Sequence, residues 1–357
     1  MAACLALAAG TALAEITSTS GRVEASVTQI NATTGQIVDQ AFEQTPGTTN
    51  ILPAEVTATL DITASTPPPT TQPSDVWTPA TQPSPQGRLV STAMVNPPTG
   101  SMPSDTKDFS IEASGLSLLT DRGFECQAKS IESRGIVLRA SELGMAGGTP
   151  IRVRSTFVIS AGVFLVTLPE GADDVTGTVS FSVSQHDEVG ARQLLAGAVE
   201  VSLDSAGNPQ ITATGDAARV IAVPFDLSDQ SSSVDQAHLL LFPLISLPYE
   251  YDATVDEPFT LTAEIQATVE AAAGGQGGGA FLGQLPTAFT EALDEFLNID
   301  LGGSIDNAAG QSDQQNAAGL ITNTLIVRRR SPCGLFGLES LLGGLLLTMM
   351  FVRRRFG

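Results

Sequence analysis

Several residue types are scarce in this 357-residue chain, and each shortage excludes a class of protein. Three cysteines are too few for a disulfide framework, so the fold must be stabilised by its core. One Trp and two Tyr leave few aromatic faces on which a carbohydrate could stack. The two histidines have no partner at zinc-ligand spacing. The residues concerned are Cys4, Cys126, Cys333, His186 and His238, and we interpret Cys126 as a buried apolar residue.

Basic residues are also scarce, with 17 Lys and Arg against 38 Asp and Glu. Two arginine clusters near the C-terminus, Arg328–Arg330 and Arg353–Arg355, hold six of the 17. The chain before Arg328 is therefore strongly acidic and repels phosphate backbones, which excludes nucleic acid as a partner. Like charge of this strength also favours solubility and weakens self-association.

Motifs for catalysis or cofactor binding are absent from the sequence. It has neither a Gly-x-Ser-x-Gly elbow nor a phosphate loop. The run 275–280 imitates a dinucleotide fingerprint but has no βαβ context, so we interpret it as a flexible loop. Acidic stretches at 226–235, 250–257 and 300–313 could offer oxygens to Ca²⁺, but without the regular loop spacing. We therefore predict no cofactor, no metal site and no enzymatic activity.

The N-terminal segment has the features of an export signal. Residues 2–14 are uncharged, small and apolar, and they end in Ala12-Leu13-Ala14 before Glu15. Signal peptidase requires this small-x-small pattern, so we predict a signal peptide over 1–14 that is cleaved after Ala14. Lipid attachment at Cys4 is the alternative, but it would leave an apolar stretch in the mature chain.

The C-terminal segment is predicted to enter a membrane. Residues 334–352 contain one charge, Glu339, and are followed by Arg353, Arg354 and Arg355. A helix of that length extends roughly 28 Å, enough to cross a hydrocarbon core. The three arginines would then remain in the cytoplasm, as the positive-inside rule requires.

The same segment resembles the tripartite C-terminal sorting signals of bacteria. Over residues 332–357 it combines a short motif, Pro332-Cys333-Gly334, with an apolar helix and a terminal arginine cluster. PEP-CTERM and Myxo-CTERM tails have this organisation. The resemblance implies processing by an exosortase-like, sortase-like or rhomboid-like enzyme, with Cys333 and Gly334 at the processed site. It also implies a β-sandwich body of the choice-of-anchor type.

Alternation of apolar and polar residues dominates the rest of the chain. It is clearest over 259–271 and returns at 151–157 and 179–184, which predicts strands with one buried face. Two further runs, 199–203 and 211–214, flank turn residues and predict a hairpin. Apolar or alternating stretches also occur at 22–30, 54–63, 88–95, 107–113, 134–140, 218–225, 237–247 and 319–327. We predict an all-β, antiparallel, jelly-roll-like sandwich.

Two segments depart from this pattern. Phe289, Leu293, Phe296 and Leu297 have helical spacing and predict a short helix near 286–297, with a strand broken by a turn as the alternative. Residues 65–106 hold ten of the 21 prolines and are interpreted as a Pro/Thr-rich insertion rather than an interdomain linker. The predicted organisation is a signal peptide over 1–14, a body over 15–327 and a tail over 328–357.

The sequence favours an exported structural or interaction protein of the cell envelope or outer surface. Its expected partners are the membrane, through the tail, and the enzyme that processes the tail, with a surface polysaccharide as a further candidate. A Ca²⁺- or glycan-binding module is one alternative function. A secreted hydrolase without a recognisable motif is another.

Overall fold

The computed structural model describes residues 11–64, 85–98, 106–169, 175–188, 190–204, 206–219, 222–226, 234–299, 307–308, 317–321 and 323–327. The hydrophobic helix predicted at the C-terminus lies outside these residues, as do Trp77, most of the acidic stretch 226–235 and most of the acidic stretch 300–313. Within them, no helix is both long and apolar enough to cross a membrane.

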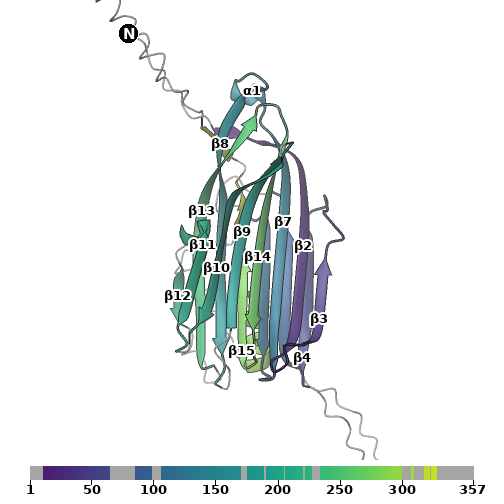
Figure 1. The fold of residues 1–357 in the computed structure, drawn as a ribbon, viewed down its shortest axis with the longest axis vertical. Helices are drawn as coiled ribbons and strands as arrows, with labels where there is room; N and C mark the ends of the chain where they lie inside the picture. Colours follow the sequence, from purple (N-terminus) through teal and green to yellow (C-terminus); the bar gives the residue numbers. More distant parts are fainter. Residues whose placement is uncertain are drawn as a thin grey trace, which may run out of the picture.

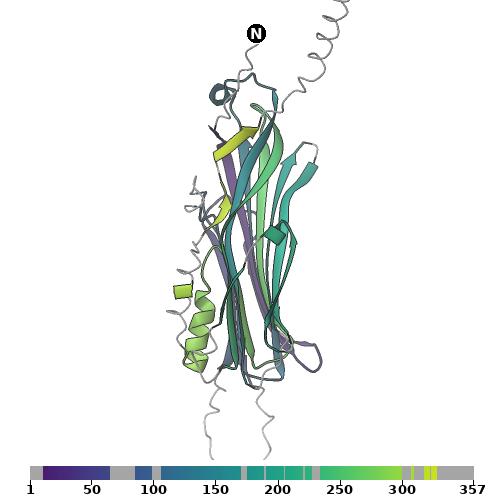
Figure 2. The ribbon, with the colours of Figure 1, turned by 90° about the vertical axis from the view of Figure 1, so that its left-hand side faces the viewer.

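Two antiparallel sheets pack face to face in an elongated body (Figures 1 and 2). Sheet B has seven strands in the order β11-β10-β9-β14-β7-β2-β3. These strands are β2 (Glu15–Asn31), β3 (Ile37–Gln44), β7 (Arg122–Val137), β9 (Val175–Asp187), β10 (Gly190–Leu203), β11 (Pro209–Gly215) and β14 (Phe259–Ala271).

Sheet A has ten strands, seven of which follow the order β1-β17-β8-β15-β6-β5-β4. In addition β13 pairs with β8 and β12, and β16 pairs with β8. The strands are β1 (Thr11–Leu13), β4 (Ala54–Thr63), β5 (Pro85–Val95), β6 (Phe109–Ser117), β8 (Pro150–Thr167), β12 (Val223–Asp226), β13 (Gln236–Thr254), β15 (Gln276–Leu282), β16 (Ala318–Leu320) and β17 (Asn323–Val327).

Sheet B owes its structure to the alternation seen in the sequence. The strand predicted at 259–271 is β14, which has the same bounds, and its apolar residues are buried between the sheets. Inward-facing side chains of β2, β7 and β9 join them in one core, which includes Cys126, as predicted. Because each strand turns one face to the core and one to solvent, period-two alternation is the expected pattern.

The centre of sheet A is buried on both faces and has no such alternation. All residues of β6 and β15 are buried. One face contacts sheet B, and the other is covered by α2 (Thr287–Leu297), whose Phe289 packs against Phe164 with ring centroids 4.9 Å apart. The helix predicted near 286–297 is thus confirmed, and the broken strand is wrong.

The flexible loop predicted at 275–280 is also wrong. Most of these residues form β15, between β6 and β8. A Cβ atom on Gly277 would lie 2.9 Å from Leu116 and 3.1 Å from Phe289, and one on Gly278 would lie 2.8 Å from Val269. The glycines therefore allow helix and sheet to approach this strand closely.

Other strand predictions are confirmed with changes in length. The hairpin predicted around 204–209 joins β10 and β11, with Leu203 opposite Pro209. The stretch 218–225 is mixed, because a 3₁₀ turn (Asp216–Arg219) precedes β12. Strand β5 falls within the Pro/Thr-rich stretch 65–106 and pairs with β4 and β6. That stretch is therefore not wholly an insertion.

The two ends of the body hold different parts of the chain. One end, here called the α1 end, carries α1 (Ala140–Leu143), β1 and β17, with Val327 opposite Arg152. The other end, here called the Pro85 end, is where Thr63 pairs with Pro85, on either side of residues 65–84. Strand β8 runs from one end to the other, and the 15 steps from Arg152 to Thr167 at about 3.3 Å per residue separate Val327 from the Pro85 end by roughly 50 Å.

Candidate functional site

Of the residues predicted to be processed, Ala12 and Ala14 are described and lie at the α1 end. Ala12 is in β1, opposite Thr324 of β17, and Ala14 joins β1 to β2. Cys333, Gly334 and the arginines Arg353, Arg354 and Arg355 lie outside the described residues. The structure thus brings Ala12 to the strand that leads into the tail, and cleavage after Ala14 would remove β1 from that strand.

A buried ionic cluster links the two sheets near the same end. Arg134 of β7 is only 1% exposed. Its Nε donates to Glu132 at 2.7 Å, and its Nη2 donates to Glu132 at 3.0 Å and also to Asp108. Its Nη1 donates to the backbone carbonyl of Leu320 at 3.0 Å. One guanidinium therefore connects sheet B to β16 and to the segment before β6.

The cluster contains two carboxylates for one cation. Burial works against the charged form of Arg134, but Glu132 and Asp108 outweigh it, so the pKa of Arg134 lies above its ordinary value. Burial also raises the pKa of Glu132, although Arg134 lowers it, and the charge of Asp108 raises it further. All three side chains are buried, which indicates a structural role.

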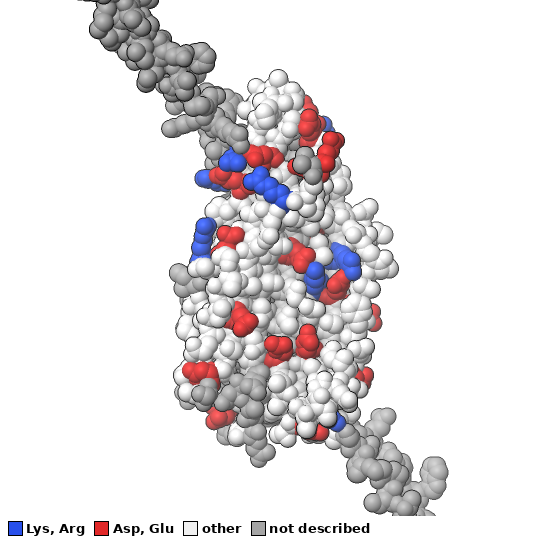
Figure 3. Space-filling view, viewed as in Figure 1, with Lys and Arg blue, Asp and Glu red and all other residues white. Residues whose placement is uncertain are grey.

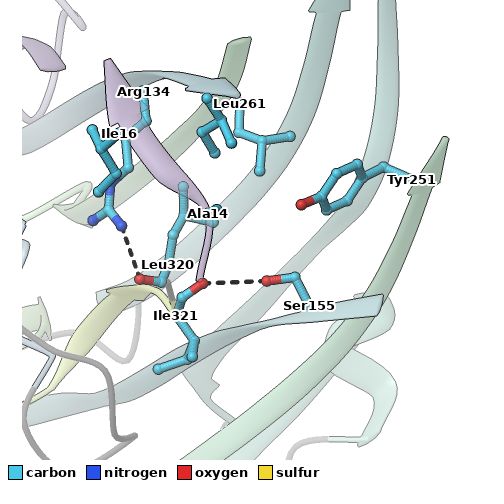
Figure 4. A pocket seen from close by; sticks show the side chains of 9 residues that line it. Ala14, Ile16, Arg134, Ser155, Tyr251, Leu261, Leu320 and Ile321 are labelled. Atoms are coloured by element: carbon cyan, nitrogen blue, oxygen red, sulfur yellow. Dashed lines mark hydrogen bonds between the residues drawn. The ribbon is translucent and has the colours of Figure 1, made fainter. Parts of the chain in front are cut away.

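A small cavity adjoins this cluster (Figure 4). Its volume is about 10 Å³, enough for about one water molecule. Sites for small organic molecules usually measure about 300–1,000 Å³, so this cavity is not a substrate site. Figure 4 shows that Ser155 and Arg134 donate to the carbonyls of Ile321 and Leu320, which attaches this segment to the sandwich. The lining residues are Ala14, Ile16, Arg134, Ile136, Ser155, Tyr251, Leu261, Leu320 and Ile321.

A third buried carboxylate, Glu112 of β6, binds the N-terminus of α2. It accepts from the backbone N–H of Phe289 at 3.0 Å and from that of Ala288 at 3.3 Å. Burial raises the pKa of Glu112 to about 7, against the lowering effect of these two donors. Because it is enclosed between strand and helix, Glu112 caps the helix and has no route to a substrate.

Figure 3 shows acidic side chains spread along the face of the body, with most of the Lys and Arg side chains in the half towards the α1 end. Towards that end, Arg152 and Arg154 of β8 pair with Asp252 and Glu250. Glu250 and Asp252 belong to β13, so the acidic stretch predicted as a loop at 250–257 is in part a strand. Within the residues described, no group of three or more His, Cys, Asp or Glu could hold a metal ion.

Neither histidine forms a recognisable catalytic arrangement. His186 is exposed at the end of β9, as predicted, and its Nε2 lies 3.0 Å from the Ser184 hydroxyl. His238 lies near the start of β13, half-buried, with its Nε2 unpartnered. Tyr249 and Tyr251 are buried in the core and therefore present no stacking face to a glycan. No observation on these residues favours the Ca²⁺, glycan or hydrolase alternatives.

Sequence reasoning missed the buried ionic residues, although it contained a signal for them. In β7 the inward positions are even-numbered, and they include Phe124, Cys126 and Ala128. Glu132 and Arg134 have the same parity, which places both charges in the core. Glu112 gave no comparable signal, because β6 is buried on both faces.

Comparisons with known proteins identify no family. No family model and no curated protein matches the chain. Among solved structures, a crystal structure of the infectious bursal disease virus VP2 subviral particle aligns at 10% identity, over 86% of this chain and 76% of that chain. Its TM-score is 0.12, so it carries no argument about fold or function.

Proposed function

We propose that this chain is an exported structural or interaction protein of the cell envelope or outer surface. In this proposal residues 1–14 are a cleaved signal peptide and residues 328–357 are a tail that anchors or sorts the protein. The partners are the membrane and the enzyme that processes the tail. The body then acts as a rigid spacer and not as a catalyst.

The observation that carries this proposal is that the two ends of the sandwich hold different segments of the chain. The strand that leads into the tail, β17, lies at the α1 end, whereas Thr63 and Pro85 meet at the opposite end. A chain anchored through residues 328–357 would therefore direct residues 65–84 away from the membrane, at roughly 50 Å from the anchored end. A spacer that presents a Pro/Thr-rich segment fits this geometry.

The buried charges support the same proposal. The Arg134 cluster joins both sheets, and Glu112 fixes α2 against sheet A. The guanidinium of Arg134 and the carboxylate of Glu112 both form their hydrogen bonds with other groups of this chain. Such groups stabilise an elongated body without serving a substrate.

The proposal is tested by intact-mass measurement and cell fractionation of protein from its native cells. The wild-type protein is expected in the envelope fraction, without residues 1–14 and without Arg353–Arg355. A chain truncated after Val327 should be released, while Cys333→Ala should retain the arginines because the processed motif is changed. An envelope-bound truncated chain would refute anchoring through the tail. Arginines retained in both full-length proteins would show that the tail is an anchor that is not processed.

A further inference from the structure

The exposed large apolar side chains of the described residues lie at the two edges of sheet B. At the β3 edge, Ile37, Val38 and Phe42 are 62%, 47% and 54% exposed, and Ile51 follows in the next segment at 81%. At the β11 edge, Ile211 is 47% exposed. These strands are the first and the last of the sheet, and each is paired on one side only within the residues described.

Strand β4, at an edge of sheet A, provides an internal comparison. Its exposed positions are Glu55, Thr57, Thr59, Asp61 and Thr63, which are charged or polar. Soluble proteins protect free edges in this way, because an unpaired apolar strand recruits another chain. The edges of sheet B differ from β4 because they also expose large apolar side chains, Phe42 on β3 and Ile211 on β11, which points to pairing.

On both edge strands, the backbone N–H and C=O groups of alternate residues point away from the sheet, where another strand could pair with them. Thr45 N–H donates to Val23, so alternation directs the backbone groups of Gln40 and Phe42 away from β2, as far as the bulge at Val38. Gln40 N–H is bound locally, to the Asp39 carboxylate at 2.8 Å.

On β11, Asp204 N–H donates to Asn208 across the turn. The same alternation therefore directs the backbone groups of Ile211 and Ala213 away from β10. Outward-facing donors and acceptors are therefore present at Phe42, Ile211 and Ala213, and Gln40 contributes its carbonyl.

The two edge strands also lie at the same level along the sheet and run in the same direction. The registers through the five intervening strands place Gln40 in one row with Gln210, and Phe42 in one row with Thr212. Residue numbers rise in the same direction on both strands, so β3 and β11 are parallel. A second copy shifted sideways by the width of the sheet would bring its β11 against β3 in parallel register.

We propose that β3 of one copy pairs with β11 of the next, joining sheet B into a lateral array. The occupant of each edge is thus another copy of this chain, bound by β-strand addition. Because the two edges differ, the contact is heterologous and continues from copy to copy. Residues 40–42 pair with residues 209–213 through the backbone groups that face outward.

Charge favours this contact over pairing of β3 with itself. Strand β3 carries Asp39 and Glu43, and an antiparallel pair of β3 strands would bring these carboxylates of two copies together. Strand β11 has no charged residue, so its approach to β3 brings no like charges opposite one another.

Orientation favours it as well, in a step that rests on the proposed anchoring. Two antiparallel β3 strands would point the α1 ends of their copies in opposite directions. Parallel pairing of β3 with β11 keeps every α1 end, and therefore every tail, on the same side. Only the second arrangement allows both copies to be anchored in one membrane.

Cysteine crosslinking of the full chain on its native cells tests the proposal. The double variant Gln40→Cys/Gln210→Cys, treated with a short bismaleimide, is expected to give a ladder of dimers, trimers and larger species. Each single variant should give no ladder, and neither should Gln40→Cys/Thr59→Cys, whose second cysteine lies on β4. At physiological ionic strength the screening length is about 8 Å, so the repulsion between acidic copies is reduced.

The outcomes separate this proposal from its rivals. Dimers from Gln40→Cys alone would indicate self-pairing of β3 and overturn it, and so would an absence of crosslinks in the double variant. Adding Ala213→Pro to the double variant removes an outward N–H at an edge, where proline is tolerated. It should abolish the ladder and leave the circular dichroism spectrum unchanged. Fractionation of the same cells reports anchoring independently, so a ladder in the released fraction would refute only the anchor.

Discussion

Two buried carboxylates of the sandwich, Glu132 and Glu112, are held in different ways. Glu132 receives two hydrogen bonds from Arg134, whose guanidinium is itself buried. Glu112 instead accepts hydrogen bonds from two backbone N–H groups at the start of α2, and neither donor carries a full charge. Both are almost inaccessible to water, and burial raises the pKa of each.

The comparison shows that a buried charge can be stabilised by a full opposite charge or by a helix terminus. The partial positive charge of a helix terminus is about half an elementary charge, whereas a guanidinium carries a whole one. Loss of the cation should therefore cost more than loss of the helix contact. Three experiments test this ranking: the substitutions Arg134→Met and Glu112→Ala, and a pH series on Glu112→Gln.

The largest effect is expected for Arg134→Met. This change leaves Glu132 and Asp108 buried without their cation, and breaking a buried pair on one side typically costs about 3–5 kcal/mol. Urea denaturation at pH 8 should show this loss, and at pH 5 a smaller one, because the carboxylates can then take up protons. Arg154→Met is the matched control: its partner Glu250 is exposed enough for a loss of about 1 kcal/mol or less. Equal losses in the two variants would contradict the ranking.

A smaller effect is expected for Glu112→Ala. The N–H groups of Ala288 and Phe289 lose their acceptor, and loss of a helix cap costs about 0.5–2 kcal/mol. Amide hydrogen exchange should accelerate across 287–297, with less change in sheet B. Glu291→Ala, at an exposed position of the same helix, should change the stability by no more than about 0.5 kcal/mol. Unchanged exchange in α2 would show that packing of Phe289, rather than Glu112, holds the helix.

The sequence predicted those strands and helices in which one face is buried and the other is exposed to solvent. Strand β14 alternates without interruption between Phe259 and Ala271, and its prediction needed no tertiary information. The helix over 287–297 was also readable, because Phe289 and Leu293 are four residues apart on one face. In both, the local pattern and the tertiary environment agree.

Prediction failed where burial is two-sided. Strand β15 reads Gln-Gly-Gly-Gly-Ala-Phe-Leu. Its glycines suggested a loop, because the side chains that require glycine at these positions belong to other parts of the sequence. Phe289 and Val269 pack against the positions where side chains would be. The partner of Glu112 lies 176 residues away, at Ala288, so no local pattern could reveal it.

The last test concerns pH and decides whether Glu112 is charged in the folded protein. Its pKa is raised from an ordinary 4.5 to about 7, mainly by burial. Between these two values the folded state binds more protons than the unfolded state, so the free energy of unfolding falls as the pH rises. The stability contributed by neutral Glu112 is complete below pH 4.5 and is lost as the pH rises through 7.

A fully shifted group changes stability by up to about 1.4 kcal/mol per pH unit. Glu112→Gln cannot ionise, so urea denaturation between pH 4.5 and 7.5 should give a slope shallower than that of the wild type by about 1 kcal/mol per unit. Glu132, whose pKa is also raised by burial, should still supply a slope of the same sign in both proteins. Parallel curves for wild type and Glu112→Gln would mean that Glu112 is ionised throughout. The N–H groups at the start of α2 would then keep a buried carboxylate charged without a cation.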